Sequence, residues 1–454
     1  MKRLTVQQVA DLSGGRVMQG DPNSMVTAVS TDTRSIPPGS LFIALVGERF
    51  DAHDFLAKAV EAGAGALLVS CAVDGVTVPV VEVADTLIGL QQLAKGYRKL
   101  IETKAVVITG SNGKTSTKDM IRAVLGQRFA VTATKGNLNN HIGLPLTVLS
   151  TEADDDFGIW EIGMNHHGEI APLAEITAPD IGVITNIGTA HIGNMGSREG
   201  IAQEKGMLAE AMTKKGVLVL NANDEFASSI GSRTSARVVE AGIEAGQVRA
   251  TDLEVLDTGT GFTLTIGNDS AEVRLPIPGR HMVSNAVIAA AVGHEAELPL
   301  DEISKALTQV SLTPGRLQTL EHAGVKIIND AYNANPDSMR VSLTTVGAMK
   351  PNGKTFALLG EMGELGQGAE IAHREIGLLA VSEGVDHICS VGDGACAYTD
   401  RLAADADQVV HHFASREEAA DFLKQTATAG DLVLLKGSRS AAMDTIYKLY
   451  ATES

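Results

Sequence analysis

The stretch VVITGSNGKT, residues 106–115, constrains the fold of this chain more than any other segment. An apolar run there ends at glycines, and Gly-Lys-Thr opens the segment that follows. Met120, Ile121, Val124 and Leu125 then recur on one face of a helix. A strand that passes through a glycine turn into a helix is the repeating unit of a mostly parallel sheet. The chain is therefore predicted to be an α/β protein.

The glycine turn predicts a phosphate-binding loop. A helix N-terminus leaves backbone N–H groups unpaired, and glycines let them approach a phosphate closely. Lys114 would reach the β- and γ-phosphates, and Thr115 would hold Mg²⁺. A glycine turn with a surface lysine is the alternative, but it does not explain why strand, glycines, Lys-Thr and helix occur in this order. We assign to the nucleotide Thr109, Gly110, Ser111, Asn112, Gly113, Lys114 and Thr115.

One position separates this loop from the general phosphate loop. The pattern G-x-x-x-x-G-K-[ST] requires glycine where this chain has Ile108. The loop is therefore a tighter variant, G-x-x-G-K-T, and not that of an ordinary kinase or GTPase.

The remaining elements predict three domains. The chain has 454 residues, more than one ordinary core accommodates. A small α/β unit precedes the loop, strands alternate with helices after it, and a second doubly wound unit follows. The predicted domains are residues 1–103, 104–313 and 314–454, of which the central one is a P-loop-type parallel sheet and the last is Rossmann-like.

Local patterns refine this organisation. Residues 200–213 and 395–404 are predicted to be helical, and the period-two pattern of residues 251–267 predicts an antiparallel hairpin. Ser415 and Glu418 have the spacing of a capping box, which predicts the start of a helix.

Charge and cysteine content restrict the partners and the compartment. Lys and Arg number 37 and Asp and Glu 55, so the net charge is −18. Binding to nucleic acid or to an anionic membrane needs dense positive charge, so neither partner is expected. The three cysteines show no disulfide framework and no metal-ligand spacing. There is no signal-peptide core, and no run approaches the roughly 18 apolar residues of a membrane span, so a cytoplasmic protein is predicted.

Three polar residues occupy positions where a metal could bind. Glu161 ends a strand near the loop, and Mg²⁺ prefers carboxylate and phosphate oxygens. His191 lies at another strand end, where open α/β sheets bind ligands, and Lys205 lies on a helix. Taken singly, each residue has an ordinary alternative: a surface glutamate, a structural histidine and a solvated lysine.

A series of motifs spans nearly the whole chain in a fixed order. It runs STDTRSIPPGSLFIALVGERFDAHDF, TGSNGKT, TKGNLNNHIGLPLT, WEIGMN, NIGTAHI, PGRHMVSNA, TPGR, NDAYNANPDSM, LGEMGELG and LLKGSR. On these motifs the chain resembles the Mur ligase family. NDAYNANPDSM and GNLNNHIGLPLT are similar to the branch that adds a dipeptide, and they separate it from branches that add one amino acid and from folylpolyglutamate synthetase.

The resemblance implies an activity. It implies an ATP- and Mg²⁺-dependent ligase that joins D-alanyl-D-alanine to UDP-N-acetylmuramoyl-tripeptide through an acyl phosphate, in peptidoglycan precursor synthesis. It also implies three domains, which bind the uridine nucleotide, ATP and the dipeptide in chain order. The third residue of the tripeptide, diaminopimelate or lysine, stays open. We expect a monomer.

The resemblance further implies roles for residues of the ATP site. Asn137 resembles an asparagine beside the γ-phosphate, and Lys205 aligns with a lysine that is carbamylated in this family. The implied catalytic residues are Lys114, Asn137, His191 and Lys205. The implied magnesium ligands are Thr115, Glu161, His191 and Lys205 as its carbamate. The implied contacts to adenine, phosphate and ribose are Asn285, Arg316 and Asp330.

Two further segments resemble substrate-binding regions. Ser30, Thr31, Asp32 and Arg34 fall where the family holds the uridine nucleotide. In NDAYNANPDSM, Asn335 and Pro336 suit the cap and first turn of a helix. That start would place neutral hydrogen-bonding groups at a cleft, for a substrate that offers an amide as well as charged ends. The alternative is a capped helix whose polar loop only faces solvent. The residues assigned to the dipeptide are Tyr332, Asn333 and Asn335.

Two other functions are compatible with a phosphate loop. A P-loop kinase would release a phosphorylated product and would not need an amine for ADP formation. A binding protein regulated by ATP would do no chemistry, although clustered magnesium-type ligands argue against it. Nucleotide turnover measured with both substrates separates the three.

Overall fold

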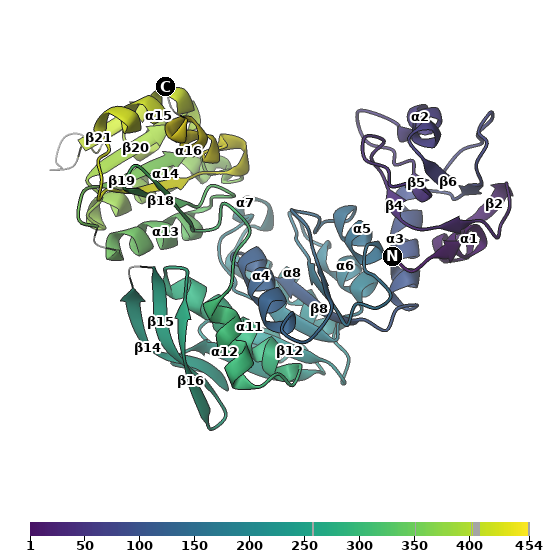
Figure 1. The fold of residues 1–454 in the computed structure, drawn as a ribbon, viewed down its shortest axis with the longest axis horizontal. Coiled ribbons are helices and arrows are strands. Elements are labelled where there is room, and N and C mark those ends of the chain that lie inside the picture. Colours follow the sequence, from purple (N-terminus) through teal and green to yellow (C-terminus); the bar gives the residue numbers. More distant parts are fainter. Residues whose placement is uncertain (257, 350, 401, 403–408, 453–454) are drawn as a thin grey trace.

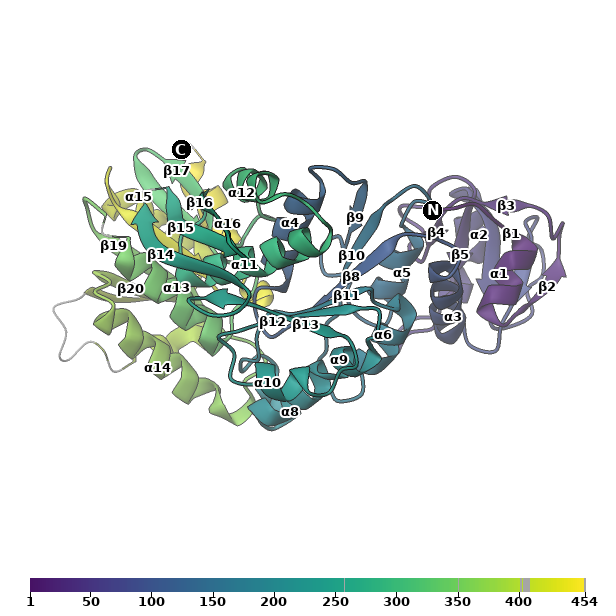
Figure 2. The ribbon, with the colours of Figure 1, turned by 90° about the horizontal axis from the view of Figure 1, so that it is seen from below.

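The computed structural model describes residues 1–256, 258–349, 351–400, 402 and 409–452. It has three larger sheets, each with flanking helices, so the predicted α/β class is confirmed. We call the parts that carry them the N-terminal lobe (residues 4–98), the central lobe (104–308) and the C-terminal lobe (318–451). A linker, residues 309–317, joins the last two. The N-terminal and C-terminal lobes lie at opposite ends, with the central lobe between them (Figures 1 and 2).

The N-terminal lobe is built on a five-stranded sheet in the order β2-β7-β6-β5-β4. Its strands are parallel except at β2, which pairs antiparallel with β7. The elements are β1 (Leu4–Thr5), α1 (Val6–Ser13), β2 (Arg16–Gln19), β3 (Met25–Val26), β4 (Val29–Ser30), β5 (Ser40–Ile43), η1 (Ala52–Phe55), α2 (Leu56–Glu61), β6 (Ala64–Val69), β7 (Val80–Glu82) and α3 (Thr86–Arg98).

The central lobe contains a nine-stranded sheet in the order β16-β15-β14-β13-β12-β11-β8-β10-β9. It is parallel from β9 to β14, and β14, β15 and β16 are antiparallel, so the predicted hairpin is confirmed. The strands are β8 (Lys104–Thr109), β9 (Val131–Ala133), β10 (Phe157–Glu161), β11 (Ile181–Ile184), β12 (Val217–Asn221), β13 (Arg237–Ile243), β14 (Val248–Leu256), β15 (Gly259–Ile266) and β16 (Asp269–Leu275). The helices are α4 (Lys114–Leu125), α5 (Gly143–Leu149), α6 (Ile170–Thr177), α7 (Ile192–Met195), α8 (Arg198–Lys205), α9 (Met207–Ala211), α10 (Ala227–Gly231), α11 (Arg280–Glu295) and α12 (Leu300–Thr308).

Strand β8 is apolar throughout because helices cover both faces of its sheet. Val106 and Ile108 point into one core, which contains residues of α4 and α11. Ala105 and Val107 point into the other, which contains residues of α5 and α6. Successive strand residues face opposite sides, so a strand buried on both faces needs an unbroken apolar run. This burial fixes the strand end from which the glycine turn departs.

Helix α3 fastens the N-terminal lobe to the central lobe. It packs against α5 and α6, and its apolar residues share a core with them. The Tyr97 hydroxyl donates to the carbonyl of Thr151 at 2.7 Å. Arg98 donates to the carbonyl of Thr177 at 2.8 Å and to Asp180 at 2.9 Å. The side chains of Tyr97 and Arg98 are buried, so these hydrogen bonds lie inside the interface between the two lobes.

The C-terminal lobe contains a six-stranded sheet in the order β17-β18-β22-β19-β20-β21. Only β17 is antiparallel, so the doubly wound pattern predicted from the sequence is confirmed. The elements are β17 (Gln318–His322), β18 (Val325–Asn329), α13 (Pro336–Ala348), β19 (Thr355–Gly360), η2 (Gly366–Gly368), α14 (Ala369–Ser382), β20 (His387–Val391), η3 (Asp393–Tyr398), β21 (Val409–Phe413), α15 (Arg416–Thr426), β22 (Leu432–Lys436), η5 (Arg439–Ala441) and α16 (Asp444–Ala451).

Local expectations differ from the structure in three places. The helix predicted over residues 200–213 is two helices, α8 and α9, which meet at Gly206. The helix predicted over residues 395–404 is the 3₁₀ turn η3 in its first part, and residues 401, 403 and 404 lie outside the described residues. At α15 the Ser415 side chain caps Glu418 N–H, but the Glu418 carboxylate accepts from Ala414 and not from Ser415. Among the described helices, none is long and apolar enough to cross a bilayer.

Candidate active site

The phosphate loop lies between β8 and α4, where the sequence predicts it. Gly113 has φ +79° and directly precedes α4, whose first turn receives no side-chain cap. A Cβ atom on Gly113 would lie 2.7 Å from Asn285 Oδ1, and one on Gly110 would overlap the Thr185 hydroxyl. Both positions therefore require glycine. The first N–H groups of α4 remain available to an anion.

A second loop, residues 185–188, braces the phosphate loop. The Thr185 hydroxyl donates to the carbonyl of Asn112 at 2.6 Å, and the side-chain oxygen of Asn186 accepts from Asn112 N–H at 3.0 Å. Gly188 donates its N–H to the Ser111 hydroxyl at 2.8 Å. These bonds fix the loop backbone before any ligand arrives, and donors held in advance need no reorganisation when charge develops.

Lys114 is a half-buried cation at the centre of the loop. Its Nζ donates to the carbonyl of Gly110 at 2.7 Å. Burial lowers the pKa of Lys114 to about 8; Glu161 opposes this shift and Arg316 adds to it. A phosphate in the loop would supply the negative charge and the acceptor oxygens that a buried ammonium needs. The loop therefore fits a polyphosphate.

Glu161, at the end of β10, has the surroundings of a cation ligand. Its side chain is buried, and Oε2 accepts from the Thr115 hydroxyl at 3.2 Å. Its other oxygen, Oε1, is also buried and has no hydrogen-bond partner within the described residues. Buried carboxylate oxygens are normally satisfied, and Mg²⁺ would satisfy this one. Two predicted ligands, Thr115 and Glu161, are thus in contact.

The positive charge of Lys114 affects the pKa values of His191 and Lys205. His191 adopts φ +65°, a strained conformation for a residue other than glycine and one that clusters at functional sites. Burial lowers the pKa of His191; Glu364 opposes the shift, and Lys114 and Lys205 add to it. Burial and then Lys114 lower the pKa of Lys205 well below its usual range. Burial and the neighbouring positive charges therefore favour the neutral forms of His191 and Lys205.

A metal in this region would depend on ligands other than a cluster of His, Cys and acidic groups. Among the described residues, no group of three such side chains could hold a metal ion. Hydroxyl and phosphate oxygens suit Mg²⁺, which usually binds through one or two carboxylates together with substrate phosphates. The Thr115–Glu161 pair beside the phosphate loop fits that mode of binding.

The C-terminal lobe contributes side chains to both loops. Asn335 caps α13 as predicted, and its Nδ2 donates to Asn112 Oδ1 at 2.8 Å. Two residues on, the Asp337 carboxylate accepts from Thr189 N–H at 2.6 Å and from the Thr189 hydroxyl at 2.9 Å. The start of α13 therefore touches the phosphate loop and the loop that precedes His191.

The linker brings Arg316 to the same place. Its Nη2 donates to the Thr115 hydroxyl at 3.1 Å, and its guanidinium carbon lies 4.0 Å from the centre of the Tyr332 ring. Its Nε is buried and lacks a hydrogen-bond partner within the described residues. A guanidinium with a free donor suits a phosphate oxygen, as the sequence predicts for Arg316.

The side chains of Asn285 and Asp330 have different surroundings. Asn285 is buried against the phosphate loop. The Asp330 carboxylate accepts from Leu317 N–H at 3.1 Å, the Ser342 hydroxyl at 2.7 Å and Lys436 Nζ at 2.5 Å. Three donors already bind this carboxylate, so a ribose hydroxyl would have to share it or displace one of them.

Other predicted residues are not brought to the phosphate loop. Asn137 is exposed, and within the described residues no hydrogen bond joins its side chain to the loop. Asn139, two residues on, lies against Gly163 and so closer to the end of β10. The residues predicted for the uridine nucleotide lie in the N-terminal lobe, at the far end from the C-terminal lobe (Figure 1): Ser30, Thr31, Asp32 and Arg34.

The N-terminal candidates form a small polar turn. The Asp32 carboxylate accepts three hydrogen bonds from the Arg34 side chain, the shortest at 2.7 Å, and the Ser30 hydroxyl donates to the carbonyl of Asp32 at 3.1 Å. The Arg34 hydrogen bonds lower the pKa of Asp32 to about 2. Arg34 is exposed, so its guanidinium is accessible to an anionic ligand.

Comparison with known proteins assigns the chain to a family. The sequence matches the Mur ligase family catalytic domain over residues 25–98, the Mur ligase middle domain over residues 108–293, and the glutamate ligase domain of Mur ligases over residues 315–439. The chain belongs to the Mur ligase family. The three matches fall, in order, on the three lobes.

Relatives of this Mur ligase match over almost its full length. It is 37% identical to the UDP-N-acetylmuramoyl-tripeptide--D-alanyl-D-alanine ligase of Escherichia coli over 99% of this chain and 98% of that protein. It is 36% identical to the ligase of the same name from Bacillus subtilis, with the same coverage. A crystal structure of MurF from Acinetobacter baumannii superposes with a TM-score of 0.92 at 32% identity over 100% of both chains. MurF from Thermotoga maritima in complex with ADP gives 0.84 at 25% identity, over 94% of this chain and 97% of that one.

The structure of this Mur ligase adds residues that sequence reasoning missed. Lys118, Thr185, Glu364 and Lys436 contact predicted site residues, and Asp337 contacts Thr189 in the loop that precedes His191. Most lie inside or beside quoted motifs, so position within a motif was the available signal. Their partners are distant along the chain, and no spacing rule connects them.

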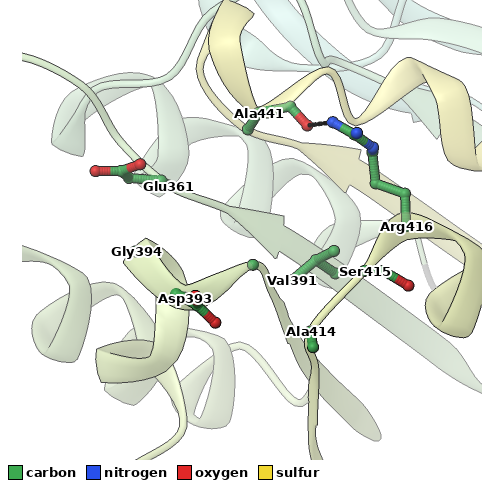
Figure 3. Close-up of a pocket in the computed structure, with 9 residues that line it drawn as sticks. Glu361, Val391, Asp393, Gly394, Ala414, Ser415, Arg416 and Ala441 are labelled. Carbon is green, nitrogen blue, oxygen red and sulfur yellow. Dashed lines mark hydrogen bonds between the residues drawn. The ribbon is translucent and has the colours of Figure 1, made fainter.

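A separate hollow opens in the C-terminal lobe of this Mur ligase. It encloses about 250 Å³ at the carboxyl ends of β19, β20 and β21, and Glu361, Asp393 and Arg416 line it (Figure 3). Arg416 donates to the carbonyl of Ala441 at 3.1 Å across one side. None of its lining residues belongs to the phosphate loop, so this hollow is distinct from the nucleotide cradle.

Proposed function

We propose that this protein is the ADP-forming ligase that joins D-alanyl-D-alanine to UDP-N-acetylmuramoyl-tripeptide in peptidoglycan precursor synthesis. The observation that carries the proposal is the contact of Thr115, Glu161 and Arg316 beside the glycine turn. It occurs in a chain whose full-length relatives bear the name of this ligase. The cradle supports phosphoryl transfer, and the relatives identify the acceptor.

The reaction needs activation of a carboxylate, because its oxyanion is a poor leaving group. Transfer of the γ-phosphoryl of ATP to the tripeptide carboxylate would make an acyl phosphate, whose leaving group is phosphate. The dipeptide amine would then attack the carbonyl to form the amide. Negative charge develops on oxygens in both steps, and Lys114, Arg316 and the N–H groups of α4 are placed to stabilise it.

We assign the divalent cation to Thr115 and Glu161, with His191 and a carbamate of Lys205 as further ligands. When bound, Mg²⁺ would neutralise the phosphate oxygens and polarise the transferred group. The low pKa of Lys205 supports the carbamate, because only a neutral amine reacts with carbon dioxide. We assign Asn137, on the exposed segment 135–138, to the γ-phosphate.

We assign the uridine nucleotide to the N-terminal lobe and the dipeptide to the C-terminal lobe. Residues 1–103, with Ser30, Thr31, Asp32 and Arg34, would bind the uridine nucleotide, and residues 104–313 would bind ATP. Residues 314–454 would receive the dipeptide at Tyr332, Asn333 and Asn335. Arg316 already stacks on Tyr332, so this edge of the C-terminal lobe lies beside the phosphate site. We place the protein in the cytoplasm, where this nucleotide substrate is made, and expect a monomer.

Phosphate release with both substrates tests the proposal. ATP, UDP-N-acetylmuramoyl-tripeptide and D-alanyl-D-alanine together should yield ADP and free phosphate, and omission of either substrate should stop turnover. ADP formation without the dipeptide, accompanied by a stable phosphorylated product, would support a kinase instead. Absence of all turnover, with tight ATP binding, would support a binding protein. Tripeptides that end in diaminopimelate or lysine, compared side by side, would identify the third residue.

A further inference from the structure

Lys118, in the second turn of α4, is a buried lysine that the proposed reaction does not use. It is 4% exposed, and its Nζ donates to the carbonyl of Thr134 at 3.1 Å. The same nitrogen lies 3.2 Å from Asp119 Oδ1 and 3.7 Å from Glu161 Oε1. A single buried ammonium thus lies between two carboxylates, one of them the proposed metal ligand.

Asp119 connects this ammonium to the linker. Its Oδ2 accepts from the backbone N–H of Thr313 at 2.7 Å, and its side chain is 9% exposed. Three residues further along the linker, Arg316 donates to the Thr115 hydroxyl at 3.1 Å. The linker is therefore tied at two points to the first two turns of α4. These ties lie on the linker, residues 309–317, which joins the central lobe to the C-terminal lobe.

Hydrogen bonds also hold Glu161 in place. Glu161 N–H donates to the Thr134 hydroxyl at 2.9 Å, while the carbonyl of the same Thr134 accepts from Lys118. Glu161 Oε2 is held by Thr115, so Oε1 is the oxygen that faces the ammonium. Removing one partner of a buried ion pair is strongly destabilising, so a Glu161 carboxylate without the Lys118 ammonium is expected to change position.

We propose that Lys118 is a positioning residue that couples the linker, through Asp119, to the metal-binding carboxylate of Glu161. The inference rests on the proposed function only in taking Glu161 as the cation ligand. Lys118 holds the Glu161 carboxylate in the position that faces Thr115 and the phosphate loop. It also fixes Asp119 as the anchor of Thr313. Affinity for a divalent cation and the position of the C-terminal lobe therefore depend on one shared ammonium.

Three variants separate this role from plain packing. Lys118→Met keeps the length and apolar stem but removes the charge, and Lys118→Arg keeps the charge. Asp119→Asn keeps the shape but weakens the anchor of the linker. Affinity for Mn²⁺ is measured by electron paramagnetic resonance with adenylyl imidodiphosphate present, and melting curves establish that each variant is folded.

Lobe position is read from spin labels on the same proteins. One label is placed on the exposed Cys71 and the other on Ile371→Cys, which is exposed on the C-terminal lobe, in a Cys396→Ser background. Double electron–electron resonance then gives the distribution of distances between the lobes. Cys71 reports for the central lobe as well, because α3 joins it to the N-terminal lobe.

Lys118→Met should weaken Mn²⁺ binding at least tenfold and broaden the distance distribution, and Lys118→Arg should stay within about threefold of the parent. Asp119→Asn should broaden the distribution and weaken Mn²⁺ binding by a smaller factor. Mn²⁺ affinity within twofold of the parent in folded Lys118→Met would overturn the proposal. If Lys118→Met does not fold, an unchanged distance distribution in Asp119→Asn overturns it. Failure of the proposed ligase reaction would instead appear as absent phosphate release in the parent protein, with these Mn²⁺ results unaffected.

Discussion

His191 of the central lobe and Glu364 of the C-terminal lobe approach each other across the lobe interface, with Nδ1 2.6 Å from Oε2. This contact is an ion pair only when His191 is protonated, and burial lowers the pKa of His191. Glu364 adopts φ +61° on a glycine-rich turn that carries its side chain to the interface. A proposed metal ligand therefore meets the other lobe before any ligand is bound.

Glu364→Gln should lower kcat/KM by about fivefold, because loss of a half-exposed polar contact between the lobes costs about 1 kcal/mol. Neutralising the carboxylate removes its attraction for His191 and loosens the interface. Steady-state phosphate release measures the effect. Glu370→Gln, which breaks an exposed pair with Arg374 on the same lobe, is the matched control and should be neutral. Equal activity of the two variants would contradict a role for the interface contact.

Lys114→Ala should reduce turnover by roughly 10³-fold or more while the fold is retained, since it removes the cation at the γ-phosphate. The side chain leaves a loop and not an apolar core, so circular dichroism should be unchanged. Lys214→Ala, on an exposed turn, serves as the control. Near-normal turnover in a folded Lys114→Ala protein would remove the phosphate-cradle interpretation.

Lys205→Ala should be nearly inactive, and bicarbonate should not restore it. A short carboxylic acid such as acetate should restore part of the activity, because it can supply the anionic oxygens of the lost carbamate. The measurement is phosphate release against acid concentration, with Lys114→Ala as a variant that acetate should not rescue. A crystal structure with magnesium bound and an unmodified Lys205 amine would contradict the carbamate.

The acceptor should be a dipeptide. With UDP-N-acetylmuramoyl-tripeptide and ATP, D-alanyl-D-alanine should support phosphate release, and D-alanine, L-alanine and D-glutamate should not. The neutral groups of Asn333 and Asn335 suit an amide that a single amino acid lacks. Efficient turnover with any single amino acid, and none with the dipeptide, would contradict the acceptor while leaving the ligase chemistry intact.

His281, in the first turn of α11, should make the free energy of unfolding decrease as the pH is lowered. Burial lowers the pKa of His281 to about 4; Asp330 opposes this shift and Lys436 adds to it. The unfolded chain, with the ordinary pKa of 6.5, takes up this proton first, so stability present above pH 6.5 is lost as pH falls toward 4. The loss should be roughly 1–2 kcal/mol at pH 5.

His281→Gln isolates this effect from the other histidines. The melting-temperature advantage of the parent over the variant should shrink between pH 7.5 and pH 5, because only the parent titrates at this position. A constant difference across that range would show that His281 keeps an ordinary pKa in the folded protein.

The sequence predicted best what is local. Lys114 and Thr115 are identified by the strand and glycines around them, and the Asn335 cap by the proline that follows it. The contact of Asn335 with Asn112 joins residues 223 positions apart, and no periodicity encodes it. Glu364 and Lys118 were not predicted for the same reason. A glutamate in a turn and a lysine in a helix have no distinguishing sequence pattern until their partners in the fold are known. Asn137 was assigned through resemblance, and a position on an exposed loop is not set by local pattern.

The burial of Tyr97 and Arg98 at the interface between the N-terminal and central lobes restricts which gene recombinations would yield a folded protein. Helix α3 is encoded with the N-terminal lobe, yet its bonds end on carbonyls of the central lobe, at Thr151 and Thr177. A recombination event that exchanged the first hundred residues for those of another ligase would expose or mismatch this joint unless the receiving surfaces of α5 and α6 changed as well. Ligand specificity in the N-terminal lobe is therefore expected to evolve by substitution within the lobe and not by exchange of the whole lobe.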